Sequence, residues 1–273
     1  MLHSERHGDV VRFRFETPSS RSMGFDVSTY LVRGTLVDTG FHDARRQLFA
    51  VLRAHRVNGV IVTHYHEDHA GNVDVVARRG YPMWIALETL GNVRQPVRIG
   101  WYRRWCWGTQ RPFTGTPRPY DPPGLQVIPA PGHSHDHHVV WDPSTGTVFG
   151  ADLFLGVKVR VTHPGEREDV RRQVASLRRV VALGPQRFFC AHRGLVAHPV
   201  AQLTAKADWM EETIAAIDAL IDQGLDDGAI VRKALGGEDR WMHFITRGDY
   251  SRRNFVGSVR ATHGVATLHP LEG

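Results

Sequence analysis

Four side chains that can bind a metal ion fall within six positions of the segment H-Y-H-E-D-H-A-G at 64–71: His64, His66, Asp68 and His69. The apolar run before them, 57–63, is typical of a buried strand. In an extended chain alternate side chains share one side, so His64, His66 and Asp68 face together. His69 follows where a helix should begin, and it can point to a neighbouring position. This arrangement favours two adjacent metal ions over one.

A metal site needs further ligands, because 17 histidines in 273 residues make one or two in a loop unremarkable. Three other strands end in a residue that can supply one: His133 in P-G-H, Asp152 in G-A-D and His192 in A-H-R-G. α/β folds place their sites where such strand ends meet. Asp38, in V-D-T-G, also ends a strand and is placed to hydrogen-bond backbone or a neighbouring histidine.

The elements that must position these residues alternate between strand and helix, which is α/β patterning. The first part of the chain predicts strands at 10–16, 29–33, 35–37, 57–63 and 82–86, with helices at 44–55 and 72–79. The second part predicts strands at 125–128, 139–141, 147–150 and 187–191, with a helix at 167–183.

Residues 88–124 interrupt this alternation of strands and helices. The segment interleaves aromatic side chains, among them Trp101, Trp105 and Trp107, with arginines, and it ends in several prolines. Long connections are often lids or binding loops, and on that interpretation these tryptophans contact an apolar substrate. The alternative is a pair of short helices that pack their aromatic residues on the core.

The chain from 200 to 273 is predicted to form a helical appendage to a domain spanning 1–199, and it loosely resembles a winged-helix tail. Apolar residues recur at helical spacing over 200–221, shorter helices are expected at about 227–235 and 251–262, and a short strand at 265–268. Its arginines could grip phosphates: Arg247, Arg252, Arg253 and Arg260. The alternative is a support for the lid or a homodimer contact.

Composition indicates an ordinary globular protein, with 41% hydrophobic and 23% charged residues. No apolar run reaches the ~20 residues that span a bilayer, and the first residues lack the apolar core of a signal peptide, so we expect a cytoplasmic protein. Two cysteines provide neither a disulfide framework nor a thiolate metal site. The net charge of +6 favours anionic substrates, while nucleic acid is an alternative partner that charge alone does not favour.

Taken in order, the motifs resemble the metallo-β-lactamase superfamily of metal-dependent hydrolases. Five of them match over about the first 200 residues: V-D-T-G, H-x-H-x-D-H, P-G-H, G-A-D and A-H-R-G. The resemblance implies a four-layer αβ/βα sandwich, in which two mixed β-sheets face each other, helices cover the outside and two metal ions lie at one edge.

Carried over position by position, the resemblance implies two metal sites. His64, His66 and His133 would bind the first ion; Asp68, His69 and His192 would bind the second; Asp152 would bridge them. This all-nitrogen and oxygen set suits two zinc ions first, with manganese or iron as alternatives. His137 falls where relatives often carry a further histidine, and we assign it, with Asp38, to the surroundings of the ligands.

Two such ions can share a water, lower its pKa and direct it at a carbonyl or phosphoryl centre. Asp68 or Asp152 would take the proton, and Tyr65 is a candidate for assisting or for contacting the substrate. The bridging aspartate argues against a true β-lactamase, and His66 argues against the flavodiiron branch, which has glutamate there.

The favoured function is therefore hydrolysis of a small ester, thioester or lactone. The alternative is a metal-dependent endoribonuclease or phosphodiesterase that uses the basic tail. A mononuclear-iron enzyme like the persulfide dioxygenases, or an inactive binding protein, ranks third.

Overall fold

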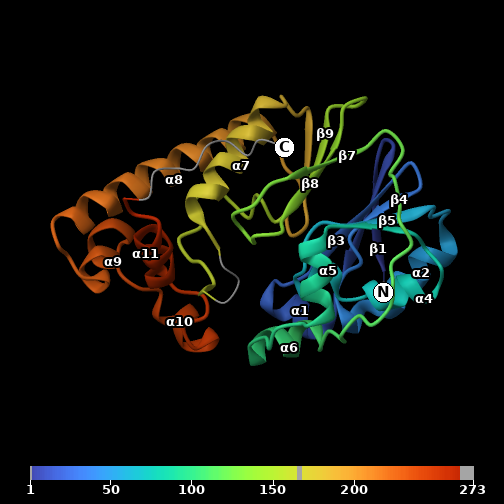
Figure 1. The fold of residues 1–273 in the computed structure, drawn as a ribbon, viewed down its shortest axis with the longest axis horizontal. Coiled ribbons are helices and arrows are strands. Elements are labelled where there is room, and N and C mark those ends of the chain that lie inside the picture. Colours follow the sequence, from blue (N-terminus) through green and yellow to red (C-terminus); the bar gives the residue numbers. More distant parts are fainter. Residues whose placement is uncertain (1, 165–167, 265–273) are drawn as a thin grey trace.

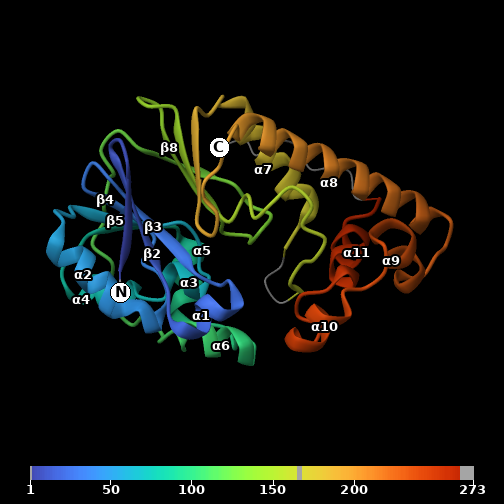
Figure 2. The same cartoon turned by 180° about the vertical axis from the view of Figure 1, so that it is seen from behind.

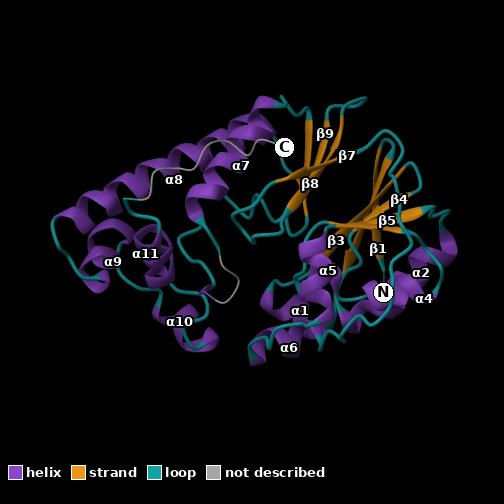
Figure 3. Ribbon diagram, in the orientation of Figure 1, coloured by secondary structure: helices purple, strands orange, loops and turns teal. Residues whose placement is uncertain are grey.

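Two β-sheets face each other with helices on their outer sides (Figures 1 and 3). The computed structural model describes residues 2–164 and 168–264. The first sheet has the order β1-β2-β3-β4-β5-β6, and its last two pairings are parallel while the others are antiparallel. Its strands are β1 (His3–His7), β2 (Val10–Phe15), β3 (Val27–Val32), β4 (Thr35–Val37), β5 (Gly59–Val62) and β6 (Met83–Ile85).

The second sheet has the order β11-β10-β9-β8-β7 and is also mixed, because β9 and β10 run parallel. Its strands are β7 (Gln126–Pro129), β8 (His138–Asp142), β9 (Thr147–Ala151), β10 (Arg187–Cys190) and β11 (Gly194–Leu195). Strands β3, β5 and β9 are buried along their whole length, because each is covered on both faces. The four-layer sandwich predicted from the motifs is confirmed.

The core between the sheets is apolar, and a polar contact lies at its edge. Tyr30, Val37 and Ile61 of the first sheet meet Phe149 and Phe189 of the second. The Tyr30 hydroxyl donates to the Cys190 carbonyl at 2.6 Å, since a buried tyrosine needs a partner for its hydroxyl. The sheets are thereby held at a fixed separation, and the strand ends that carry the candidate ligands come together at one edge.

Helices of the first half cover the first sheet and the metal loop. They are α1 (Pro18–Met23), the 3-10 turn His42–Ala44, α2 (Arg45–Ala54), α3 (Glu67–Ala70), α4 (Val73–Arg78), α5 (Leu87–Arg94) and α6 (Trp101–Trp107). α2 buries Leu48, Val51 and Leu52, the stripe expected from the sequence. β1 and α1 were not predicted, because β1 is polar and exposed and α1 is short, set by its Thr17 capping box and Gly24.

The segment 88–124 contains α5, α6 and irregular chain. Tyr102, Cys106 and Trp107 of α6 are buried, and the Trp107 indole donates to the Phe25 carbonyl at 2.7 Å. Trp101 and Trp105 are 45% and 52% exposed. α6 thus packs one face on the core and leaves the other in solvent.

α7 (Val170–Ala182) packs on the second sheet, and the C-terminal helices extend from it on the side away from the first sheet (Figure 2). α8 (Pro199–Asp222) lies along α7 and buries the predicted stripe. α9 (Asp227–Leu235) and α11 (Arg252–Ala261) pack on α8, and α10 (Arg240–Thr246) approaches α6. α10 was not predicted, because it has fewer than two turns and is defined by its Asp239 cap.

The strand predicted at 265–268 lies outside the described residues. Among the residues that are described, none of the helices combines the length and the apolar character needed to cross a bilayer.

Candidate metal centre and the cavity beside it

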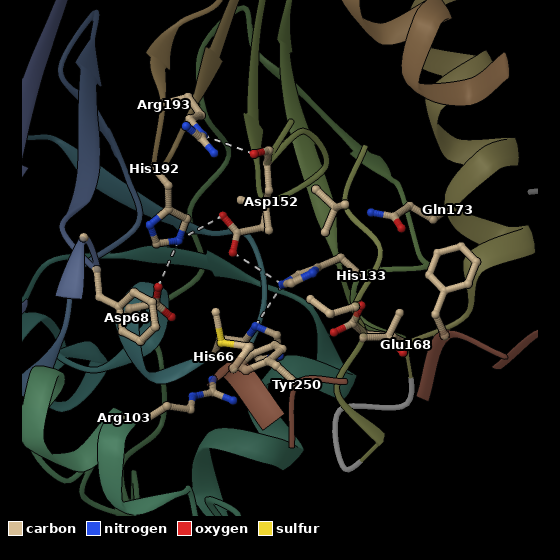
Figure 4. A pocket seen from close by; sticks show the side chains of 18 of the residues that line it. His66, Asp68, Arg103, His133, Asp152, Glu168, Gln173, His192, Arg193 and Tyr250 are labelled. Carbon is tan, nitrogen blue, oxygen red and sulfur yellow. Dashed lines mark hydrogen bonds and ion pairs between the residues drawn. The ribbon is translucent and has the colours of Figure 1, made fainter. Parts of the chain in front are cut away.

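Strand ends deliver the seven candidate ligands to one place. His64 follows β5, His66 precedes α3, and Asp68 and His69 lie within α3, which begins earlier than the sequence predicted. His133 follows β7, Asp152 directly follows β9, and His192 follows β10. Figure 4 shows Asp152 between His133 and His192, with a contact to each. The sequence placed these residues at strand ends, and the fold brings those ends together.

The first group consists of His64, His66, His133 and Asp152, all buried. His66 Nδ1 lies 3.0 Å from His64 Nε2 and 3.1 Å from His133 Nε2. Asp152 Oδ2 lies 3.4 Å from His133 Nε2. Ligands about 2.0–2.1 Å from a tetrahedral zinc ion are about 3.3 Å from one another, so these spacings fit such an ion.

The second group consists of Asp68, His69, Asp152 and His192. Asp152 Oδ1 lies 3.4 Å from both His69 Nε2 and His192 Nε2, and Asp68 Oδ2 lies 3.2 Å from His192 Nε2. Asp152 therefore directs one oxygen to each group, as a bridging carboxylate would.

The donor chemistry also fits two cations. His69 Nε2 and Asp152 Oδ1 are buried and have no hydrogen-bond partner among the described residues. Buried polar atoms without a partner are costly, and a metal ion is one of the few groups that can satisfy several of them together. The residues present therefore suit a divalent metal at each group.

Hydrogen bonds on the far side of the imidazoles orient them toward the centre. His69 Nδ1 donates to Asp38 Oδ2 at 2.7 Å, and His192 Nδ1 donates to the Asp26 carbonyl at 2.8 Å. The Thr63 hydroxyl donates to Asp38, so His64 Nδ1 donates to Thr63 Oγ1 at 3.0 Å. Each bond places the proton on Nδ1 and leaves the Nε2 lone pair for a ligand.

His137 holds the backbone of the bridging residue. Its Nδ1 donates to the Ala130 carbonyl at 3.1 Å, and its Nε2 accepts the Asp152 amide at 3.2 Å. Both ring nitrogens are engaged, so this histidine supports Asp152 from behind.

Electrostatics differ between the two groups. Burial lowers the pKa of His64 and His66 well below the usual value, so both are neutral and able to ligate. Burial alone would also lower the pKa of His69 and His192, but the Asp152 and Asp68 carboxylates raise it well above the usual value. A ligating imidazole must be neutral, so cation binding at the second group is coupled to proton release.

Two backbone features fix the ligands further. At Gly132 (φ 138°) a Cβ would lie 2.3 Å from the backbone of Gln173, so only glycine lets the turn that carries His133 pack against α7. Ala151 has a φ of 43°, which is strained for a residue with a side chain, and the register of β9 and β10 shifts there. That strained position directs Asp152 into the site.

A cavity of about 480 Å³ opens on both ligand groups. Its lining includes His66, Asp68, His133, Asp152 and His192 on one side. The opposite walls come from the loop after β9 and from the C-terminal helices, and they are mostly apolar: Leu155, Val159, Val161, Met210, Met242, Tyr250 and Phe255. The C-terminal region therefore forms part of the cavity.

The proposed substrate contacts fall into two sets. Trp107 lines the cavity, whereas the exposed Trp101 and Trp105 are absent from its described lining. Tyr65 lines a second, smaller hollow with α6 and the chain around Pro96, and its amide donates to Asp136.

Sequence reasoning did not identify a buried ion pair beside the metal loop. Arg103 donates from Nε and Nη2 to the two oxygens of Glu67 at 2.6 and 2.7 Å, and both side chains are buried. The pair ties α6 to α3, the short helix that carries Asp68 and follows His66. The one indication of this ion pair in the sequence is the glutamate at position 67 within H-x-H-E-D-H.

Two of the four tail arginines are engaged within the tail. Arg252 donates to the carbonyls of Leu235 and Gly237, and Arg260 donates to Asp227. Of the four arginines considered for binding phosphates in a nuclease, two are therefore exposed, Arg247 and Arg253.

The model of the metallo-beta-lactamase superfamily matches residues 23–95 and 121–192, together more than half of the chain. A Drosophila melanogaster protein named "Beta-lactamase-like protein 2 homolog" is 25% identical over 213 residues, which cover 71% of this chain and 67% of that protein. The Bacillus subtilis "Probable metallo-hydrolase YqjP" is 24% identical over 271 residues, covering 79% and 81%.

Among solved structures, a metallo-beta-lactamase family protein from Thermus thermophilus has a TM-score of 0.64 at 17% identity, covering 92% of this chain and 91% of that one. The DIM-1 metallo-beta-lactamase has a TM-score of 0.55 at 16% identity, covering 77% and 97%. These likenesses concern the fold.

Proposed function

We propose that this chain, which belongs to the metallo-beta-lactamase superfamily, is a dinuclear metal-dependent hydrolase of a small ester, thioester or lactone. The observation that carries the proposal is the cavity. Its apolar walls end at two groups of metal-type ligands that share Asp152. An acyl chain would lie against those walls with its carbonyl at the ligand groups.

Zinc is the first candidate for both ions, with manganese or iron as alternatives, because the ligands are imidazole and carboxylate. Bound there, two cations would lower the pKa of a shared water and stabilise negative charge on the substrate oxygen.

The chain's own residues supply the remaining parts of the reaction. The carboxylate of Asp68 or of Asp152 would accept a proton from the attacking water, since both line the cavity. The apolar side chains from α8, α10 and α11 exclude water and orient the acyl group. We propose no nucleic-acid substrate, because Arg252 and Arg260 are engaged within the tail.

The test is a screen of p-nitrophenyl esters, thioesters, lactones and phosphodiesters with metal-reconstituted protein. We expect about two metal ions per chain and turnover of the acyl substrates. Asp152→Ala should lose at least one ion and most of the turnover, while Asp74→Ala, which removes a surface partner of Arg78, should lose neither. Phosphodiester turnover without ester turnover, or a single iron per chain, would overturn the proposal.

A further inference from the structure

Lys206 is a buried cation in the wall of the cavity. It lies on α8 between Leu203 and Met210, is 2% exposed and belongs to the cavity lining. Its Nζ donates to the Leu153 carbonyl at 3.0 Å. The carbonyl belongs to the residue that follows the bridging Asp152, so the ammonium lies on the metal side of the cavity.

The fold provides no full counter-charge for this ammonium. An ammonium group has three N–H donors, and among the described residues one hydrogen bond is made and no carboxylate lies within ion-pair distance. The ring of Phe154, 5.8 Å away, is a weak partner. Burial lowers the pKa of Lys206 to about 8, so the group is still largely charged near neutral pH.

Packing does not explain the choice of lysine. The neighbouring positions of the same buried stripe are Leu203, Ala207 and Met210, and an unbranched apolar side chain would fit between them. A buried charge without a partner opposes folding. Such a residue is expected where a ligand supplies the missing partner.

The cavity carboxylates do not supply it, because Asp152 and Glu168 favour the charged form of Lys206 but neither lies within ion-pair distance of it. Glu168 also lines the cavity, but its Oε1 accepts the His163 amide at 2.9 Å. Burial raises the pKa of Glu168 to about 7, so it carries only part of a charge near neutral pH.

We propose that Lys206 binds a carboxylate of the substrate, so that the hydrolysed ester, thioester or lactone carries an anionic group on its acyl part. The scissile carbonyl would lie at the two ligand groups and the carboxylate at Nζ, with the carbon chain between them in the cavity. This inference rests on the proposed function and narrows it from acyl substrates in general to anionic ones.

The test compares two series of esters with zinc-loaded protein. p-Nitrophenyl monoesters of succinate, glutarate and adipate carry a distal carboxylate, and p-nitrophenyl butyrate, pentanoate and hexanoate are their neutral counterparts. We expect at least one anionic ester to exceed its neutral counterpart in kcat/KM by about 10- to 100-fold, the effect of a hydrogen bond to a charged group.

The matched variants separate charge from packing. Lys206→Met should abolish the preference, so that each anionic ester is hydrolysed no faster than its neutral counterpart, and Lys206→Arg should retain part of it. Lys233→Met, which removes an exposed lysine of α9, should change neither series. A preference that survives in Lys206→Met, or a wild-type protein without one, would overturn the inference. An unfolded Lys206→Met protein would also overturn it, since the ammonium would then be structural.

A binding measurement distinguishes failure of this inference from failure of the proposed function. By calorimetry, zinc-loaded wild type should bind glutarate or adipate more tightly than pentanoate or hexanoate, and Lys206→Met should not. If no ester is hydrolysed, the proposed function fails, and this difference in affinity alone decides whether Lys206 is an anion site.

Discussion

At the scale of single residues, the candidate ligands are oriented by side chains that hydrogen-bond them without being ligands themselves. Asp38 accepts from both His69 and Thr63, and Thr63 in turn accepts from His64. One carboxylate thereby orients a histidine of each group. Such outer partners typically change metal affinity by about 10–100-fold when removed.

Asp38→Asn tests this role. Asparagine tolerates the left-handed backbone of this position (φ 66°), so the turn should be retained while the charge beside His69 is lost. We expect metal affinity at the second group to fall by about 10–100-fold, measured by competition with a chromogenic chelator. Asp74→Asn on α4 is the control, and equal affinities in the two variants would contradict the prediction.

The burial of Lys206 makes the free energy of unfolding depend on pH, and the direction of that dependence follows from the pKa of this lysine. Its pKa falls from 10.5 in the unfolded chain to about 8 in the fold, so its burial opposes folding below about pH 8 by roughly 3 kcal/mol. The penalty is relieved as the pH rises from 8 towards 10.5, because the folded protein releases the proton first. Lys206→Met removes this penalty, but it also removes the hydrogen bond to the Leu153 carbonyl.

We therefore expect Lys206→Met to be at least as stable as wild type near pH 7 and to lose that advantage towards about pH 10. Urea unfolding at both pH values, with metal content matched, measures it. A variant that is less stable at neutral pH and gains on the wild type at high pH would contradict the assigned sign.

At the scale of elements, α10 presents two different faces. Met242 lines the cavity, whereas Trp241, the preceding residue, is 72% exposed. Successive helical residues point about 100° apart, so one face of this short helix faces the cavity and the other faces solvent. α6 likewise has two faces, because Trp107 lines the cavity while Trp105 is exposed to solvent.

Met242→Ala should therefore lower kcat/KM for p-nitrophenyl hexanoate relative to acetate by about 3- to 10-fold, the value of one or two lost apolar contacts. Trp241→Ala, one residue away, should leave the ratio unchanged. The reverse pattern would place the acyl chain on the outer face of α10.

The ion pair between Arg103 and Glu67 couples α6 to the metal loop. Arg103→Met leaves a buried carboxylate beside Asp68, and we expect it to destabilise the fold by about 3–5 kcal/mol in urea unfolding. The double variant Glu67→Gln with Arg103→Met should recover most of this loss. If the double variant were as unstable as the single one, packing of the Arg103 stem would be the main contribution.

At the scale of the whole molecule, the C-terminal helices belong to the same core as the second sheet. α8 buries Leu203, Ala207, Met210, Ile214 and Ile217 in the cluster that also holds α7 and β10. The appendage predicted from residue 200 onward thus shares its core with the preceding sheet, and it also supplies walls of the cavity.

A chain ending at residue 199 tests this directly. It should expose the apolar face of α7 and aggregate or unfold, as judged by circular dichroism and size-exclusion chromatography. A monomeric, folded and fully active fragment would show that the C-terminal helices are dispensable.

Pattern alone predicted most of the framework, because strand ends and metal-type ligands are local features. The α/β order and the placement of His64, Asp152 and His192 at strand ends needed only spacing and periodicity, whereas the superfamily was inferred from the resemblance of the motifs. Short elements such as β1, α1 and α10 were missed, since their limits come from caps and neighbours and their periodicity is weak.

The sequence by itself determined which atoms are available for chemistry: imidazole and carboxylate groups at the ends of buried strands. Only the tertiary structure decided which side chains form the cavity beside them. Trp101 and Trp105 are exposed while Met242 and Lys206 line the cavity, and no local pattern distinguishes these outcomes. The reason is physical: a ligand motif is set by neighbours along the chain, whereas a cavity wall is set by helices that pack together across some 100 residues of sequence.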